Sequence, residues 1–191
     1  MNNRFTEKAQ NALNCALERA RDFGHTYVGS EHILLGLLSV SDSIACRILT
    51  GRGVTEDKTT EIIRDSVGTG LRSSVSAADM TPMTKKLIEE SAYASSRLGN
   101  SYIGTEHLLI GIAAESDSMG AKLLRDSGFS ELRLREEVRR QSAKYQSLPG
   151  AGLSVDAREA IRRAGEDARR LGHLYVGTEH ILLGILRLPE C

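Results

Sequence analysis

A nine-residue motif occurs three times in this chain of 191 residues, which indicates a fold built from repeated units. It reads GHTYVGSEH at 24–32, GNSYIGTEH at 99–107 and GHLYVGTEH at 172–180. The first two copies are offset by 75 residues, and the same offset aligns Thr6 with Thr81. A register that persists beyond the motif indicates duplication of a whole structural unit. Only half a unit accompanies the third copy.

Each unit is predicted to be helical throughout. Apolar and small residues recur at spacings of three and four before each motif, which is typical of a helix with one buried face. A polar N-cap stands before each of these first helices, and a glycine suited to a left-handed C-cap follows it. The predicted N-caps are Thr6, Thr81 and Ser154, and the predicted C-cap glycines are Gly24, Gly99 and Gly172.

The end of each motif leads into a second helix that is apolar nearly all round. Its body reads EHILLGLL, EHLLIGIA or EHILLGIL, which predicts a central, buried helix. The glycine within it costs about 1 kcal/mol relative to alanine, a cost that close helix packing can offset. We expect the residue before each EH pair to be the N-cap, which places the glutamate at the first helical position. These N-caps are Ser30, Thr105 and Thr178.

Two shorter helices complete each unit. The third is expected from Asp42 to about Thr50 in the first unit, and from Asp117 to about Asp126 in the second. The fourth begins after the predicted N-caps Thr55 and Ser130. Segments rich in Gly, Ser and Ala are interpreted as linkers. The predicted order is repeat one at 4–66, a linker at 67–79, repeat two at 80–146, a linker at 147–152 and a partial third repeat at 153–191, with residues 1–146 forming one domain.

Composition excludes several classes of partner. The 25 lysine and arginine residues balance 25 aspartate and glutamate residues, so no net charge favours nucleic acid or an anionic membrane. No apolar run approaches the roughly 20 residues that cross a bilayer, and the N-terminus lacks a secretory signal, so we expect a cytoplasmic protein. Cys15, Cys46 and Cys191 are odd in number and lack CxxC spacing, which indicates neither a disulfide framework nor a zinc site.

The sequence contains no motif for catalysis. GxxxxGK[ST] is absent, and the EH pairs lack the second histidine of HExxH. Serine and cysteine residues have no strand-turn-helix elbow to occupy. We therefore expect no enzymatic activity, no cofactor and no metal. In the arginine-rich segments RLREEVRR and REAIRRAGEDARR, carboxylates are interleaved at ion-pair spacing, which favours a solvated face over a nucleic-acid surface.

The glutamate of each motif has two interpretations. A carboxylate at a helix start can support capping, because it interacts favourably with the helix dipole. It can also bind a cation such as a guanidinium, while the unpaired N–H groups of a neighbouring helix start bind an anion. Each glutamate follows a predicted first-helix N-cap by 25 residues, so each unit could present both groups to a ligand that carries both charges. The pairs are Thr6 with Glu31, Thr81 with Glu106, and Ser154 with Glu179.

The segments FTEKAQNALNCALERARDFGHTYVGSEHILLGLL and MTPMTKKLIEESAYASSRLGNSYIGTEHLLIGIA resemble the double repeat of the Clp/Hsp100 N-terminal domain, most strongly its ClpC type. The resemblance extends over residues 4–146, and 153–188 resemble the first half of another repeat. It implies an all-helical module of two pseudo-symmetric four-helix units. In the family this module sits on an ATP-driven unfoldase ring and receives substrate and adaptor proteins.

The resemblance also implies a ligand. Related ClpC-type domains recognise phosphoarginine, with the motif glutamates holding the guanidinium and the first-helix starts helping to hold the phosphate. This implies two equivalent sites, one of Glu31 with Thr6 and one of Glu106 with Thr81. Glu179 with Ser154 matches the pattern, but its half-unit lacks the helices that complete the fold.

Two functions follow from these observations. The first is a non-enzymatic module that recognises arginine-phosphorylated substrates or adaptors for a Clp ATPase ring. The second is a stand-alone regulatory or scaffold protein that meets partners through helix faces and has no small-ligand site. In both, the apolar last helix needs cover, so we expect residues 153–191 to pack against the main domain or to self-associate.

Overall fold

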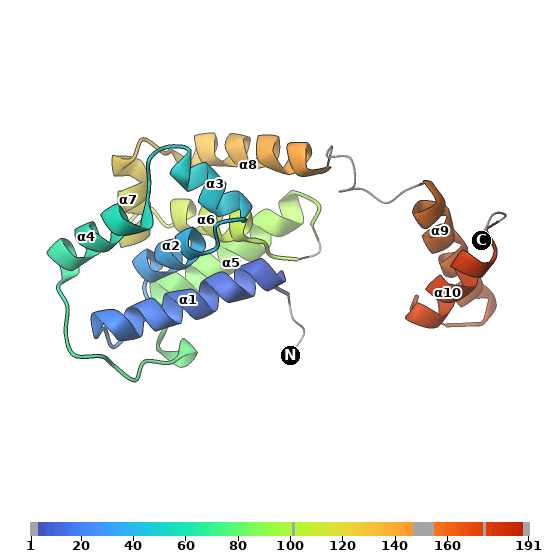
Figure 1. Cartoon of the computed structure of the whole chain (residues 1–191), viewed down its shortest axis with the longest axis horizontal. Coiled ribbons are helices and arrows are strands. Elements are labelled where there is room, and N and C mark those ends of the chain that lie inside the picture. Colours follow the sequence, from blue (N-terminus) through green and yellow to red (C-terminus); the bar gives the residue numbers. More distant parts are fainter. Residues whose placement is uncertain (1–3, 101, 147–154, 174, 189–191) are drawn as a thin grey trace. The chain divides into compact units, whose positions relative to one another are not determined.

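The computed structural model describes residues 4–100, 102–146, 155–173 and 175–188. The chain forms two compact units, Met1–Ser142 and Ala143–Cys191 (Figure 1). The described residues contain ten α-helices and no strand, so the predicted all-α fold is confirmed.

The first unit contains two sets of four helices in the same order. Each long first helix is followed by an apolar second helix and two further helices, as the repeat predicts. The first set is α1 (Glu7–Phe23), α2 (Ser30–Ser39), α3 (Ile44–Thr50) and α4 (Glu56–Val67). The second set is α5 (Pro82–Arg97), α6 (Thr105–Ala114), α7 (Met119–Asp126) and α8 (Glu131–Gln146), and the short 3-10 helix η1 (Ala77–Asp79) precedes it.

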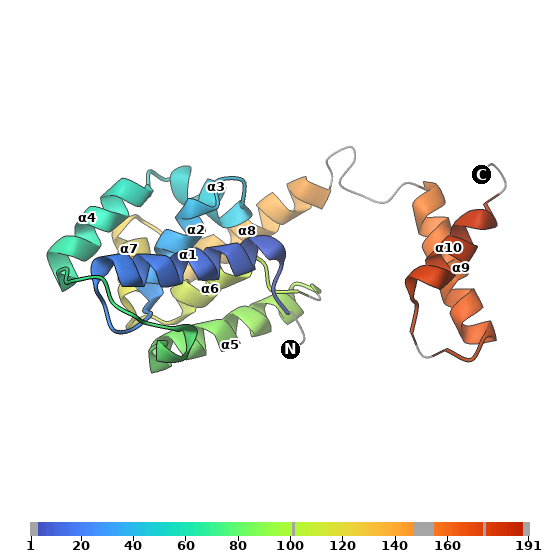
Figure 2. The ribbon, with the colours of Figure 1, turned by 60° about the horizontal axis from the view of Figure 1, so that its bottom comes forward.

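The apolar helices α2 and α6 form the centre of this unit. They lie between α3 and the long helices α1 and α5 (Figure 1), and they contact each other as well as helices of both repeats. Almost every residue of both helices is buried, from Ile33 to Leu38 in α2 and from His107 to Ile112 in α6. Figure 2 shows the same arrangement after a turn of the molecule. The all-round apolar pattern of these helices is explained by their neighbours on every side.

The glycine within each second helix allows a close helix crossing. A methyl group added to Gly36 would lie well inside van der Waals contact of the carbonyl oxygen of Ala12 in α1. Gly111 would meet the Leu87 carbonyl oxygen in α5 in the same way. The crossing therefore requires glycine, and the packing offsets its low helix propensity.

The caps of the long helices are largely as predicted. Thr6 and Thr81 accept hydrogen bonds from the backbone N–H groups of Ala9 and Thr84, at 3.2 and 3.1 Å. Gly24, Gly99 and Gly172 adopt the left-handed conformation, with φ of 76°, 74° and 73°. The predicted cap Ser154 lies outside the described residues.

The third helices begin two residues later than the sequence suggested. Ser43 and Ser118 are the N-caps, and their hydroxyls accept from the third residue of each helix, Cys46 N and Ala121 N. Asp42 instead pairs with Lys8 of α1 at 2.5 Å. The fourth helices begin after Thr55 and Ser130, as predicted.

The segment between the two repeats is fastened to the end of α1. Gly70 N–H donates to the Phe23 carbonyl at 2.7 Å, and Ser73 N–H donates to the Arg21 carbonyl at 3.1 Å. Val75 is buried, and its carbonyl accepts from the Arg21 guanidinium at 2.9 Å. Residues 70–75 of this segment are therefore packed against the first unit.

The second unit is a two-helix hairpin of α9 (Val155–Arg170) and α10 (Thr178–Leu186). Gly184 makes the same close crossing with Ala160 that Gly36 makes with Ala12. The buried Asp167 carboxylate pairs with Arg187 at 2.6 Å. Several apolar side chains of the hairpin are nevertheless exposed, and these are Ile161, Leu171, Val176, Ile181, Leu182, Leu183, Ile185 and Leu186.

Among the described residues, no single helix has the length and apolarity to cross a membrane, and one bent pair, α2 with α3, meets that test by length and composition only.

Candidate functional site

The motif glutamates follow a glycine cap rather than a hydroxyl cap. The N-caps of α2, α6 and α10 are Gly29, Gly104 and Gly177, so the predictions for Ser30, Thr105 and Thr178 were wrong by one residue. Ser30 is the first helical residue, and its hydroxyl accepts from the N–H of Gly120 in α7 at 2.8 Å. Each glutamate is therefore the second helical residue.

Each motif glutamate folds back over its own cap glycine. A methyl group on Gly29 would clash with the Glu31 carboxylate, and Gly104 and Glu106 have the same relation. The carboxylate thus lies at the positive end of its own helix, where the dipole stabilises it. Gly177 and Glu179 repeat the arrangement in the second unit. The capping interpretation of the glutamates therefore fits the geometry of all three copies.

The Glu31 carboxylate is buried, with 5% of its side chain exposed. It accepts from the Ser30 hydroxyl at 3.4 Å and lies close to the side chain of Tyr27. Burial raises the pKa of Glu31, while its own backbone N–H and the nearby His25 oppose that rise. Burial, together with the neighbouring Glu31, also raises the pKa of Tyr27. A cationic ligand would replace a costly buried charge with a paired one.

A chain of hydrogen bonds fixes the imidazole ring of His32, whose Nδ1 lies 3.5 Å from the Glu31 carboxylate. Gly29 N–H donates to His32 Nδ1 at 2.9 Å, which fixes the proton of neutral His32 on Nε2. That proton faces His25 Nδ1 at 2.8 Å, and His25 Nε2 lies 3.1 Å from the Gly68 carbonyl oxygen. Burial, together with the nearby His25, lowers the pKa of His32 to about 3. His32 is therefore a neutral structural side chain.

The Glu106 cluster is a more open version of the same arrangement. Its glutamate side chain is 17% exposed, and Tyr102, the counterpart of Tyr27, is 58% exposed. Asn100 takes the place of His25, and its amide nitrogen lies 3.1 Å from His107 Nε2. Burial lowers the pKa of His107, and the nearby Glu106 opposes that shift.

Backbone pairing joins each motif loop to the first-helix start of the other repeat. Val28, just before Glu31, pairs with Met80, and its carbonyl accepts from Thr81 N–H at 3.1 Å. The loop before Glu106 pairs in the same way with the start of α1, since the Ile103 carbonyl accepts from Thr6 N–H at 2.9 Å. The backbone pairing therefore favours Glu31 with Thr81 and Glu106 with Thr6 over the predicted pairs, Glu31 with Thr6 and Glu106 with Thr81. Each helix start lies beside the loop of the other repeat.

The third copy of the motif keeps its own hydrogen bonds. His180 Nδ1 accepts from Gly177 N–H at 2.9 Å, and His180 Nε2 lies 2.8 Å from His173 Nδ1. The ligand atoms of His173, Glu179 and His180 lie within 4.8 Å of one another, close enough to hold a cation. Both histidines are engaged in this hydrogen-bonded chain, which explains their positions. Glu179 is 54% exposed, and its predicted partner Ser154 lies outside the described residues.

Two features of these clusters were missed from the sequence. The glycine before each hydroxyl residue was not recognised as the N-cap, because Ser and Thr are generally preferred at that position. The histidine pair at 25 and 32, seven residues apart, had a visible signal, since it returns at 173 and 180.

The sequence as a whole matches the Clp repeat (R) N-terminal domain family over residues 4–127, and again over 80–190. The chain belongs to this family. The second match extends to residue 190 and so includes the third copy of the motif.

Curated relatives contain this Clp N domain within much longer chains. The negative regulator of genetic competence ClpC/MecB of Bacillus subtilis (strain 168) is 38% identical over 135 residues, which cover 71% of this chain and 16% of that protein. The chaperone protein ClpB of Oceanobacillus iheyensis is 35% identical over 147 residues, covering 77% of this chain and 18% of that protein. The chain thus spans less than a fifth of either relative.

Solved Clp N domains share the fold. The N-terminal domain of the ClpD chaperone from Arabidopsis thaliana has a TM-score of 0.61 at 24% identity, covering 75% of this chain and 97% of that one. A complex of the ClpV N-domain with a VipB peptide has a TM-score of 0.55 at 20% identity, covering 70% and 83%. At these identities the likeness concerns the fold alone.

Proposed function

We propose that this chain is a non-enzymatic recognition domain that, in the cytoplasm, binds substrate or adaptor proteins for a Clp-type ATP-dependent unfoldase, and that it does so through phosphoarginine. The observation that supports this function is the backbone pairing of each motif loop, three residues before its glutamate, with a helix start of the other repeat. The family relation to ClpC supports the partner class, and the ClpV domain with its VipB peptide supports peptide recognition by this fold.

The geometry suits a ligand with a positive and a negative end. A guanidinium pairs with a carboxylate through charge-assisted hydrogen bonds, and a phosphate suits the free N–H groups at a helix start. The two sites are Glu31 with the start of α5 at Thr81, and Glu106 with the start of α1 at Thr6. Because Glu106 is the more exposed glutamate, its site admits the ligand with less rearrangement.

Isothermal titration with free phosphoarginine tests the proposal. The wild type should bind, and the double variant Glu31→Gln with Glu106→Gln should show no measurable heat, because the guanidinium loses both carboxylates. Circular dichroism confirms that the variant is folded, and free arginine and free phosphate report each half of the ligand separately. Unchanged affinity in the folded double variant would exclude these glutamates as the site.

A second titration tests the exchanged pairing. In a Glu31→Gln background only the Glu106 site remains, so Thr6→Ala should weaken binding there and Thr81→Ala should not. The Glu106→Gln background should give the reverse. Each threonine variant removes the same kind of N-cap, so each controls for the other's cost of about 1 kcal/mol in stability. Equal effects in both backgrounds would refute the pairing.

The second candidate, a scaffold that meets proteins through helix faces, is favoured by the α10 surface. Leu182 and Leu186 are 57% and 66% exposed, although the corresponding positions of α2 and α6 are buried or nearly so. We propose that this face associates with α10 of a second copy, as α2 and α6 contact each other in the first unit. Sedimentation velocity should show a dimer that Leu182→Glu with Leu186→Glu converts to monomer; a monomeric wild type would contradict the proposal.

A further inference from the structure

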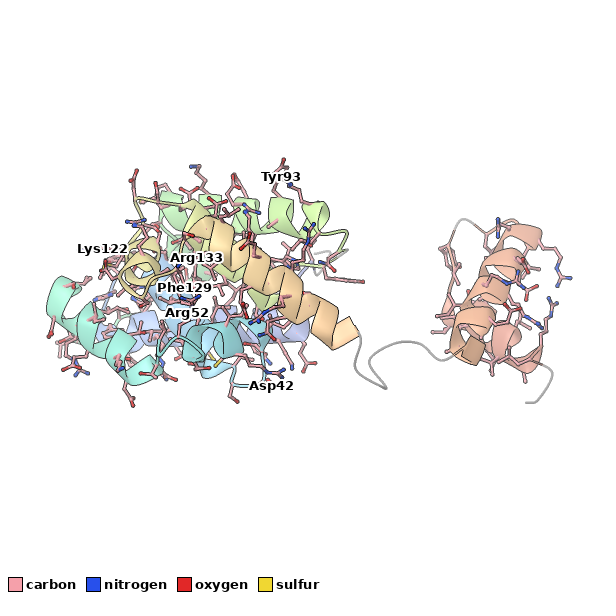
Figure 3. All side chains as sticks on the ribbon, turned by 90° about the horizontal axis from the view of Figure 1, so that it is seen from above. Asp42, Arg52, Tyr93, Lys122, Phe129 and Arg133 are labelled. Atoms are coloured by element: carbon pink, nitrogen blue, oxygen red, sulfur yellow. The ribbon has the colours of Figure 1, made fainter. Side chains whose placement is uncertain are left out.

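A pocket of about 240 Å³ opens between the two repeats of the first unit, away from the motif glutamates. One wall comes from α3 and the turn after it, and the other from α8 and the turn before it. Figure 3 shows Arg52, Phe129 and Arg133 close together at this place. The charged and aromatic lining residues are Arg47, Arg52, Phe129, Arg133, Glu137 and Arg140.

Four arginines face one carboxylate in this pocket. Arg140 pairs with Glu137 at 2.7 Å, and Gln141 donates to the same carboxylate oxygen at 3.0 Å. These bonds lower the pKa of Glu137, with a smaller contribution from Arg52. The single carboxylate is therefore already engaged, and the pocket keeps an excess of positive charge.

Arg52 and Arg133 supply that excess. The Arg52 guanidinium lies over the ring of the buried Phe129, 5.4 Å from its centroid, which orders the cation without neutralising it. Within the described part of the chain, neither Arg52 nor Arg133 makes a salt bridge to a carboxylate. Both side chains belong to exposed residues, so their N–H groups are available to a ligand.

The fold itself does not require this cluster, because the pseudo-equivalent surface lacks it. With the offset of 75, Arg52 corresponds to Ser127 and Phe129 corresponds to Val54. The other charged pocket residues, Arg47, Arg133, Glu137 and Arg140, correspond to Lys122, Lys58, Ile62 and Asp65. The pseudo-equivalent positions thus carry neither an arginine nor an aromatic ring.

We propose that this pocket binds carboxylate side chains of an acidic segment in a protein partner. Guanidinium groups present forked donors that match a carboxylate, and several of them around one hollow favour a group of negative charge. The volume suits one or two side-chain carboxylates. This carboxylate ligand is negatively charged, whereas the guanidinium expected at Glu31 and Glu106 is positively charged. One partner could therefore bind at the pocket and at the motif glutamates with different residues.

Fluorescence anisotropy with labelled peptides tests the pocket. The probe is an acidic peptide of alternating Glu and Ser, and the comparison peptide has Gln in place of Glu. The wild type should bind the acidic peptide and not the Gln peptide. Arg52→Gln with Arg133→Gln should weaken binding roughly tenfold, equal to about 1.4 kcal/mol. Added salt should weaken binding as well, because the contact is electrostatic.

Matched variants separate a site from general charge. Lys58→Gln with Lys122→Gln removes two positive charges from the pseudo-equivalent surface and should leave the affinity unchanged. Glu31→Gln with Glu106→Gln should also leave it unchanged, which distinguishes this pocket from the phosphoarginine sites. Equal weakening by the lysine pair, or no binding of the acidic peptide by the wild type at low salt, would overturn the proposal. Binding of inorganic phosphate without binding of the peptide would overturn the peptide assignment.

Discussion

The clusters around Glu31 and Glu106 are built from one motif, yet they differ in how far they shield their carboxylates. Around Glu31, the rings of His25, Tyr27 and His32 pack on one another, with centroid distances of 5.0 to 5.7 Å. Around Glu106, an asparagine replaces the first histidine and the tyrosine is largely exposed. The shared backbone fixes where each carboxylate lies, and the surrounding side chains decide how strongly water reaches it.

This difference changes the energetics of the two sites. Burial raises the pKa of Glu31, so its ionised form is destabilised in the free protein. A ligand cation would offset that destabilisation, but only after the buried carboxylate has become accessible. Glu106 offers less gain and easier access. Two copies of one motif can therefore bind one ligand with different affinities and rates.

Substitution of the cap glycines should give the largest difference in stability between the two clusters. Gly29→Ala forces the buried Glu31 carboxylate to move, and overpacking and cap loss together should lower the unfolding free energy by about 3 kcal/mol. Gly104→Ala should cost about 1 kcal/mol, because Glu106 can turn toward solvent. Urea unfolding followed by circular dichroism measures both. Equal losses would show that exposure of the carboxylate does not matter.

Acid should destabilise the protein through the motif histidines. His32 has a pKa of about 3 when folded and about 6.5 when unfolded. Between these values the unfolded chain binds a proton that the folded chain does not, so the unfolding free energy falls as the pH falls, by up to about 1.4 kcal/mol per pH unit. The lowered pKa of His107 adds to this loss. The raised pKa of Glu31 has the opposite sign, because protonation of a buried carboxylate favours the folded state at low pH.

We expect a net loss of about 2 kcal/mol between about pH 7.5 and about pH 4.5. Unfolding curves across this range measure it. His32→Asn should flatten the dependence more than His107→Asn, because asparagine can still accept from the cap N–H but does not titrate. A protein that gains stability on acidification would contradict the assignment of the neutral histidines.

The smallest expected effect comes from making the first cluster resemble the second. His25→Asn removes the bond to the Gly68 carbonyl and the ring contact with Tyr27, and should cost about 1 kcal/mol. The reciprocal change Asn100→His lies at an exposed residue and should alter stability by less than about 0.5 kcal/mol. Thermal unfolding of both variants measures this asymmetry. A larger loss for Asn100→His would reverse it.

The helices, their order and most of their caps could be predicted from the sequence, because helix periodicity and capping are local properties. The glycine in α2 was correctly linked to close packing, and the backbone of α1 provides the contact. The cap of α2 could not be predicted in this way. Ser30 is a favourable cap residue, but its hydroxyl is used by Gly120, 90 residues further along the chain.

The pairing of helix starts with glutamates depends on tertiary structure for a related reason. Thr6 and Glu31 are close in sequence, and so are Thr81 and Glu106, which suggested sites within each repeat. The backbone pairing of Val28 with Met80, and of Phe5 with Ile103, depends on how the repeats associate. Equal repeat spacing is compatible with both pairings, so only the tertiary structure distinguishes them.

Under the proposed function, the exchanged pairing also defines the smallest part of this protein that could be transplanted with its binding sites. A single repeat carries a glutamate loop and a helix start that belong to different sites, and it completes neither. Two repeats complete both at once, so a graft into another protein must carry the pair together. A change that separates the repeats would therefore remove two sites in one step, while a change within one loop would spare the other site.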